Sequence, residues 1–147
     1  MTILDSYAVL AFLKGEAAAS EVEDLIVGGG AAMTVLGVAE VLDHLIRISG
    51  VDEENASLDI AQLGLDTAIV ADEAIAAAAG RLRARWYHRT SCPVSLADCV
   101  TAEAARSLRR PLATSDPPLL DVCHHENVAI AVLPGSDGSL WSAPGGS

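Results

Sequence analysis

The feature that most constrains the fold of this chain is a regular alternation of short apolar segments with helical segments. Strands are expected at residues 2–4, 32–34, 67–70, 112–114 and 128–133. Helices are expected at residues 7–13, 16–27, 35–48, 53–63, 72–88, 95–109 and from 116 onward. Strands that alternate with helices are joined by crossovers, which produce a parallel sheet covered on both faces. The sequence therefore predicts a three-layer α/β/α sandwich around a parallel sheet of about five strands.

The length and composition favour one soluble domain. A chain of 147 residues suits a single core, and a hydrophobic content of 51% excludes general disorder. The longest apolar run is too short to span a bilayer, and the first residues carry no basic leader, so a cytoplasmic protein is expected. We expect one domain over residues 1–134 and a flexible tail rich in Gly, Ser and Pro over residues 135–147, where Leu140 and Trp141 offer a docking point.

The cysteines and aromatic residues exclude several kinds of site. Cys92, Cys99 and Cys123 are odd in number and form no Cys-x-x-Cys pair, which argues against a disulfide framework or a structural zinc site. Aromatic residues make up only 3% of the chain, which argues against an extended platform for stacking single-stranded bases.

The charge distribution is uneven. A net charge of −11 argues against nucleic-acid binding, because phosphates are bound by Lys and Arg. However, seven of the nine basic residues lie between residues 81 and 110, so a local cationic strip is compatible with an acidic chain. Arg81, Arg85 and Arg89 fall at helical spacing and are candidates for holding an RNA backbone, although a solvated helix face explains them equally well.

Three aspartates are expected near one edge of the sheet. Asp5 follows the first strand directly, and Asp116 follows the strand at residues 112–114 after one serine. Ligands of open parallel sheets bind at the carboxyl ends of the strands, where loops and helix N-termini converge. Asp98 opens a helix, but a loop precedes it, so its position at this edge is less constrained.

A fourth acid, Glu40, lies inside the expected helix at residues 35–48. Gly37, one turn earlier, predicts open space beside its side chain. Four converging carboxylates would raise one another's pKa unless a cation neutralised them. Oxygen-only ligation of this kind suits Mg²⁺ or Mn²⁺.

Each acid also has a purely structural interpretation. Asp5 and Asp116 suit helix N-caps, the latter strengthened by the proline that follows it. Asp98 suits the acidic partner of a capping box opened by Ser95. Glu40 suits a solvated helix face. Spacing alone does not decide between a site and four unrelated acids.

The segments around the four acids resemble, in order, the four motifs of VapC-type PIN-domain ribonuclease toxins. The first motif is ILDSYAVLAFLKGE at residues 3–16, and the second is VAEVL at residues 38–42. The third is SLADC at residues 95–99, and the fourth is LATSDP at residues 112–117. The order and approximate spacing agree with the family from residue 1 to about residue 134.

The resemblance implies a PIN fold, a homodimer and metal-dependent endonucleolytic cleavage of RNA. It also implies a cognate VapB-type antitoxin that covers the active site. Residue by residue, the acidic quartet of the family matches Asp5, Glu40, Asp98 and Asp116. Small hydroxyl positions that flank the metal site in the family match Ser6, Thr114 and Ser115.

One departure concerns Tyr7, which stands where many members carry Ser or Asn, so no catalytic role is assigned to it. The preferred interpretation is an endoribonuclease in which Asp5, Asp98 and Asp116 hold Mg²⁺, with Glu40 binding directly or through water. One alternative is a PIN-fold protein that binds RNA or a partner without catalysis. Another is a phosphotransfer enzyme with Asp5 as nucleophile, disfavoured because Tyr7 stands where that class has a second Asp.

Overall fold

A computed structural model describes residues 1–65 and 68–145 of the chain. In this part of the chain the sheet has four strands in the order β2-β1-β3-β4, and every pairing is parallel. The strands are β1 (Thr2–Leu4), β2 (Ala31–Ala32), β3 (Leu112–Thr114) and β4 (Ile130–Val132). The parallel α/β architecture predicted from the sequence is confirmed, with one strand fewer than expected.

The expected fifth strand is reduced to a single β-bridge. Ile69 pairs in parallel with Thr34, and its N–H donates to the Met33 carbonyl at 2.9 Å. The strand expected at residues 67–70 therefore survives only around Ile69, beside the chain that follows β2, while Thr67 lies outside the described residues. One bridge gives this edge too few ladder hydrogen bonds to count as a strand.

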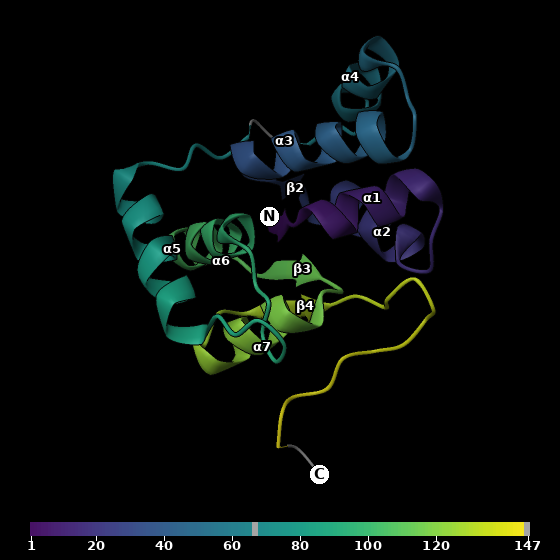
Figure 1. The fold of residues 1–147 in the computed structure, drawn as a ribbon. Coiled ribbons are helices and arrows are strands. Elements are labelled where there is room, and N and C mark those ends of the chain that lie inside the picture. Colours follow the sequence, from purple (N-terminus) through teal and green to yellow (C-terminus); the bar gives the residue numbers. More distant parts are fainter. Residues whose placement is uncertain (66–67, 146–147) are drawn as a thin grey trace.

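Helices cover both faces of the sheet, as Figure 1 shows. The first half of the chain contributes α1 (Ser6–Lys14), α2 (Ala19–Gly29), α3 (Val35–Asp43), the π-helical turn η1 (His44–Ile48) and α4 (Glu53–Ala61). The second half contributes α5 (Glu73–Trp86), α6 (Leu96–Leu108) and α7 (Pro117–His125). No helix among the described residues is long and apolar enough to cross a bilayer.

An apolar cluster fills the space between the sheet and the helices on each face, because successive side chains of a strand point to opposite faces. Leu4 and Ala113 point to the cluster formed with α1, α2 and α3. Ile3 and Leu112 point to the opposite cluster, formed with α5, α6 and α7. All four residues are fully buried, so each central strand is apolar on both sides, as a doubly covered sheet requires.

The helix starts follow local capping chemistry. The side chains of Asp5, Thr34, Asp52 and Asp72 each accept a hydrogen bond from a backbone N–H in the first turn of the following helix. These bonds satisfy backbone donors that have no partner within the helix. Two of these caps, Asp5 and Thr34, are also buried, at the points where strands end and helices begin.

Candidate active site

Asp5 sits at the carboxyl end of β1 and caps α1. One carboxylate oxygen accepts a hydrogen bond from the Ala8 N–H at 2.9 Å, and the other accepts one from the Thr114 hydroxyl. The side chain is only 2% exposed. Burial raises the pKa of Asp5 to about 7, with further contributions from the charges of Asp98 and Asp116, although the two hydrogen bonds oppose the rise. The cap predicted from the sequence is therefore real, but the same carboxylate also belongs to a group of acids.

Thr114 joins the two acids that follow the central strands. It ends β3, is fully buried, and its hydroxyl donates to Asp5 while accepting the Asp116 N–H at 3.0 Å. Asp116 stands at the N-cap position of α7, yet its side chain makes no capping hydrogen bond. Burial, followed by the charge of Asp98, raises the pKa of Asp116 to about 6. The Leu119 N–H in the first turn of α7 lowers this pKa, as a cap would, but burial and the charge of Asp98 outweigh it.

Asp98 is the common neighbour of the other acids. Its carboxylate accepts the Ser95 N–H at 3.1 Å, and the Ser95 hydroxyl accepts the Asp98 N–H at 3.0 Å, which completes the expected capping box. The negative charge of Asp98 raises the pKa of Asp5, Glu40 and Asp116 alike. Its own pKa is raised by burial. Capping α6 and joining the acidic group are thus compatible roles for one side chain.

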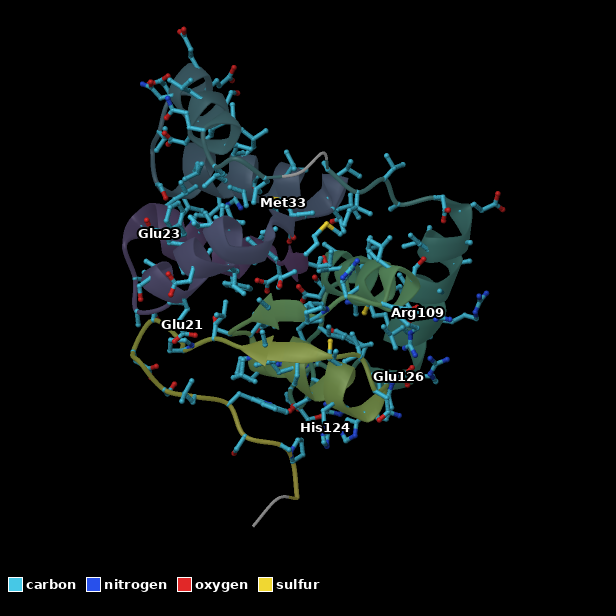
Figure 2. The ribbon with its side chains drawn as sticks, turned by 180° about the vertical axis from the view of Figure 1, so that it is seen from behind. Glu21, Glu23, Met33, Arg109, His124 and Glu126 are labelled. Carbon is cyan, nitrogen blue, oxygen red and sulfur yellow. The ribbon has the colours of Figure 1, made fainter. Side chains whose placement is uncertain are left out.

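Glu40 approaches the group from α3. It is partly buried, and burial, followed by the charge of Asp98, raises its pKa while the nearby Ser6 hydroxyl lowers it. The expected open space at Gly37 is wrong, because a Cβ there would lie 2.8 Å from the Met33 methyl group. Figure 2 shows Met33 beneath α3, where its flexible side chain has filled the gap.

Tyr7 lies among the four acids although it was given no catalytic role. Burial, followed by the charges of Asp116, Asp98, Asp5 and Glu40, raises the pKa of its hydroxyl. More than half of the side chain, 54%, is nevertheless exposed. Tyr7 therefore forms part of the surface next to the acids.

The donor chemistry of the acidic group fits a hard divalent cation. All four side chains offer only carboxylate oxygens, and burial raises the pKa of each, so a bound cation would relieve the cost of their ionisation. Within residues 1–65 and 68–145, however, no three His, Cys, Asp or Glu side chains are arranged closely enough to hold an ion as they stand. Binding would require the carboxylates to converge.

The arginines predicted to bind RNA lie on another part of the molecule. Arg81 and Arg85 belong to α5, which packs against α6, whereas Arg89 lies in the turn after that helix. Arg85 pairs with Glu126 at 3.0 Å, and Glu126 also accepts hydrogen bonds from Arg106 and the Trp86 indole, both at 2.9 Å. Figure 2 places Glu126 on the α7 side, away from Met33 under α3. A role for these arginines in binding RNA stays a prediction.

The sequence argument missed Lys14 and His44, which lie beside the acids. The Lys14 ammonium and the His44 Nε2 atom are 2.9 Å apart, which connects the end of α1 to the start of η1. Both residues line a cavity of about 340 Å³ that Asp116 and Ser115 also line. A separation of thirty residues hid this pair, because only the packing of α3 against α1 brings it together.

Comparison with known proteins supports the same fold. A family profile described as PIN domain matches residues 2–124. None of the curated proteins compared with the chain matches it significantly.

Several solved structures share the architecture. VapBC2 from Rickettsia felis, bound to a promoter DNA fragment, has a TM-score of 0.66 at 14% identity, covering 88% of this chain and 96% of that one. DNA-bound VapBC from Salmonella typhimurium has a TM-score of 0.64 at 16% identity, covering 88% and 96%. VapC20 from Mycobacterium tuberculosis, a Sarcin-Ricin loop cleaving toxin, has a TM-score of 0.63 at 14% identity, covering 82% and 93%. Identities this low establish the fold alone.

Proposed function

Because the chain belongs to the PIN-domain family, we propose that it is a metal-dependent endoribonuclease and the toxin component of a VapBC-type toxin–antitoxin pair. The family profile spans most of the chain, and the solved structures with this fold include toxins crystallised with their partners. One of them is described as cleaving the Sarcin-Ricin loop, which is RNA. These comparisons motivate the activity, and the acidic group supplies the chemistry for it.

The observation that carries the proposal is that the Thr114 hydroxyl links the Asp5 carboxylate to the Asp116 backbone at the ends of the two central strands, while the charge of Asp98 raises the pKa of Asp5, Asp116 and Glu40. Such a concentration of negative charge costs folding energy, so a protein keeps it where a cation or a reaction needs it. Two of the acids directly follow strands, which is where parallel α/β folds bind their ligands.

In the proposed site Asp5, Asp98 and Asp116 hold Mg²⁺, or Mn²⁺ as a substitute, and Glu40 binds directly or through water. When bound, the ion would activate a water for in-line attack on an RNA phosphodiester and stabilise the leaving oxygen. The protein's part is positional. The Ala8 N–H and the Thr114 hydroxyl fix the two oxygens of Asp5, and the Ser95 N–H fixes one oxygen of Asp98.

The supporting hydroxyl groups differ in what they do. Thr114 orients Asp5, and Ser6 lies beside Glu40, so both act through an acid. Ser115 faces the cavity next to Asp116 and is free to contact substrate. The proposed partners are a VapB-type antitoxin, RNA and a second copy of this chain, and the proposed location is the cytoplasm.

The Asp98→Asn variant tests the proposal. Asparagine keeps an oxygen to accept the Ser95 N–H, so the capping box survives while the charge is lost. Cleavage of labelled total RNA should require Mg²⁺, stop with a chelator, and fall at least 100-fold in the variant. The matched control is Asp24→Asn, which removes one charge from an exposed position of α2 and should leave cleavage unchanged.

Full Mg²⁺-dependent cleavage by Asp98→Asn would refute the assigned site. A metal-replete wild-type protein, free of antitoxin, that binds RNA and never cuts it would favour the alternative of a PIN-fold binding protein without catalysis. Unchanged thermal unfolding of Asp98→Asn is needed to assign a loss of cleavage to the lost charge.

A further inference from the structure

A groove with mixed polar and apolar lining runs along α1. The cavity of about 340 Å³ is bordered by Asp116 and Ser115 at one end and by Lys14 and His44 at the other, with Tyr7 between them. Its volume lies within the range of ligand pockets. The segment after β4, including Pro134 and Gly135, forms part of its wall. The groove thus connects the proposed reaction centre to a positive charge.

The spacing along α1 is regular. Tyr7 and Lys14 are seven residues apart, so they lie on the same face of the helix, two turns from each other. Seven residues span about 10 Å at a rise of about 1.5 Å per residue. A stacked strand rises about 3.4 Å per nucleotide, so this distance spans about three nucleotides.

The charges at the far end of the groove suit a phosphate. Lys14 is the only lysine of the chain, and its ammonium is partly exposed, with a side-chain accessibility of 37%. The ammonium donates to the Nε2 atom of a neutral His44 ring at 2.9 Å and makes a loose pairing with Glu16 at 3.9 Å. A pairing this long and exposed contributes little, so the ammonium is available to a ligand. Arg47 borders an adjoining cavity with His44 and Tyr7, but its guanidinium pairs with Asp43 at 2.8 Å, so Lys14 supplies the positive charge of the groove.

The backbone also indicates a functional site. The helix that carries Glu40 widens into the π-helical turn η1 at His44. Such turns occur frequently at functional sites, because they shift side chains out of their helical positions. Here the turn begins at the residue that contacts Lys14, next to α1 (Figure 1).

We propose that this groove is an RNA subsite: Lys14, supported by His44, binds a backbone phosphate about three nucleotides from the cleaved bond, and a base stacks on Tyr7. The inference rests on the proposed nuclease function and names where its substrate strand runs. A group of acids repels the phosphates of an RNA substrate. A lysine two helical turns away along α1 attracts a phosphate of the same strand and offsets that repulsion. The exposed Tyr7 ring supplies a sequence-tolerant surface for a base.

Binding measured without cleavage tests the subsite. In the Asp98→Asn background, fluorescence anisotropy with a fluorescein-labelled single-stranded RNA of mixed sequence gives the affinity over a range of salt concentrations. Lys14→Gln should weaken binding several-fold at low salt and reduce the slope of log K against log salt by about 0.7, the value for one lost phosphate contact on a single strand. The matched control Arg110→Gln removes an exposed charge between α6 and β3 and should change neither quantity, while Arg81→Gln tests the alternative path of the strand along α5.

The tyrosine variants separate stacking from hydrogen bonding. Tyr7→Ala should weaken RNA binding about 5- to 100-fold, whereas Tyr7→Phe keeps the ring and should bind like the parent. With Asp98 restored, Lys14→Gln should raise KM for RNA more than it lowers kcat, which a merely structural residue would not do. Thermal unfolding midpoints of all variants, measured without RNA, should match the parent within a few degrees.

The experiment distinguishes failure of the proposed subsite from failure of the proposed nuclease function. If the wild-type protein cuts RNA while Lys14→Gln and Tyr7→Ala bind like Arg110→Gln, the nuclease proposal stands and the subsite is refuted. If Arg81→Gln, and not Lys14→Gln, reduces the slope of log K against log salt, the RNA strand runs along α5 and the proposed subsite is refuted. If Lys14→Gln weakens binding of the partner protein and leaves RNA affinity unchanged, the groove serves a protein and the proposal is overturned. A wild-type protein that neither binds nor cuts RNA removes both proposals together.

Discussion

Replacing Asp116 with asparagine should stabilise the protein when divalent ions are absent. The carboxylate of Asp116 is partly buried and lies within the field of Asp98, and the Leu119 N–H of α7, which lowers its pKa, does not offset these two effects. Its ionised form is therefore less favourable in the folded chain than in the unfolded one. Asparagine has nearly the same shape and carries no charge, so it removes the penalty and little else.

The pKa of Asp116 sets the magnitude and the pH window. A rise from 3.8 to about 6 corresponds to at most about 3 kcal/mol, at about 1.4 kcal/mol for each pKa unit. Because the side chain is partly exposed to water, we expect about 1–2 kcal/mol. The folded state holds its proton more tightly, so this stability is present below pH 3.8 and is lost as the pH rises through about 6. The variant should match wild type near pH 3.5 and exceed it above pH 7.

Urea denaturation with a chelator at several pH values between 3.5 and 7.5 measures this difference. The control Asp24→Asn removes the same charge from an exposed site on α2 and should show little change at any pH. Similar m-values are needed before the midpoints are compared. Saturating Mg²⁺ should stabilise wild type more than Asp116→Asn, because only wild type keeps all the proposed ligands.

Two results would refute the reasoning. If Asp116→Asn is less stable than wild type at pH 7.5 in the chelator, the carboxylate stabilises α7 as a helix cap. If the difference between the two proteins is the same at pH 3.5 and 7.5, the ionisation of Asp116 is not its cause. Either outcome would remove the electrostatic argument for a shared acidic group.

Two further predictions concern contacts outside the acids themselves. Thr114→Val should destabilise the protein by about 2–3 kcal/mol, because it leaves a buried Asp5 oxygen and the Asp116 N–H without hydrogen-bond partners. Thr114→Ser keeps both hydrogen bonds and should cost about 1 kcal/mol. Equal losses of stability for the two variants in urea denaturation would contradict the hydrogen-bond argument. Glu126→Gln should lower stability at pH 7, and this effect should disappear near pH 3. Burial opposes ionisation of Glu126, but hydrogen bonds from Trp86, Arg106 and Arg85 together lower its pKa. A thermal unfolding midpoint that does not change at pH 7 would show that these pairings do not contribute to stability.

The parts of the fold that could be predicted depend on local chemistry. The apolar triplets at residues 2–4 and 112–114 were recognisable as strands, and Ser95 with Asp98 carried the spacing of a capping box. The edges of the sheet were less predictable. β2 has only two residues, and the expected strand near Ile69 forms a single bridge, because edge pairing depends on tertiary packing more than on propensity.

The candidate site was predictable in its residues and not in its surroundings. Motif resemblance identified the acids, but the position of Asp98 near the others follows from the packing of α6 against β3, α3 and α7. The contact between Lys14 and His44 joins residues thirty apart, and the π-helical turn at His44 leaves no periodic signal in the sequence. Likewise, Arg85 was recognisable as basic, whereas its pairing with Glu126 was not.

The Thr114 hydroxyl restricts how this protein can change during evolution. Its proton is committed to Asp5, and its lone pair receives the Asp116 N–H, so both directions of the hydrogen bond are in use. Serine offers the same two hydrogen bonds and is the less costly substitution, but valine, although closest in shape, offers neither. A lineage that replaces Asp5 by a hydrogen-bond donor would have to replace Thr114 as well. Substitutions at these two positions, 109 residues apart in the chain, should therefore be inherited as a pair.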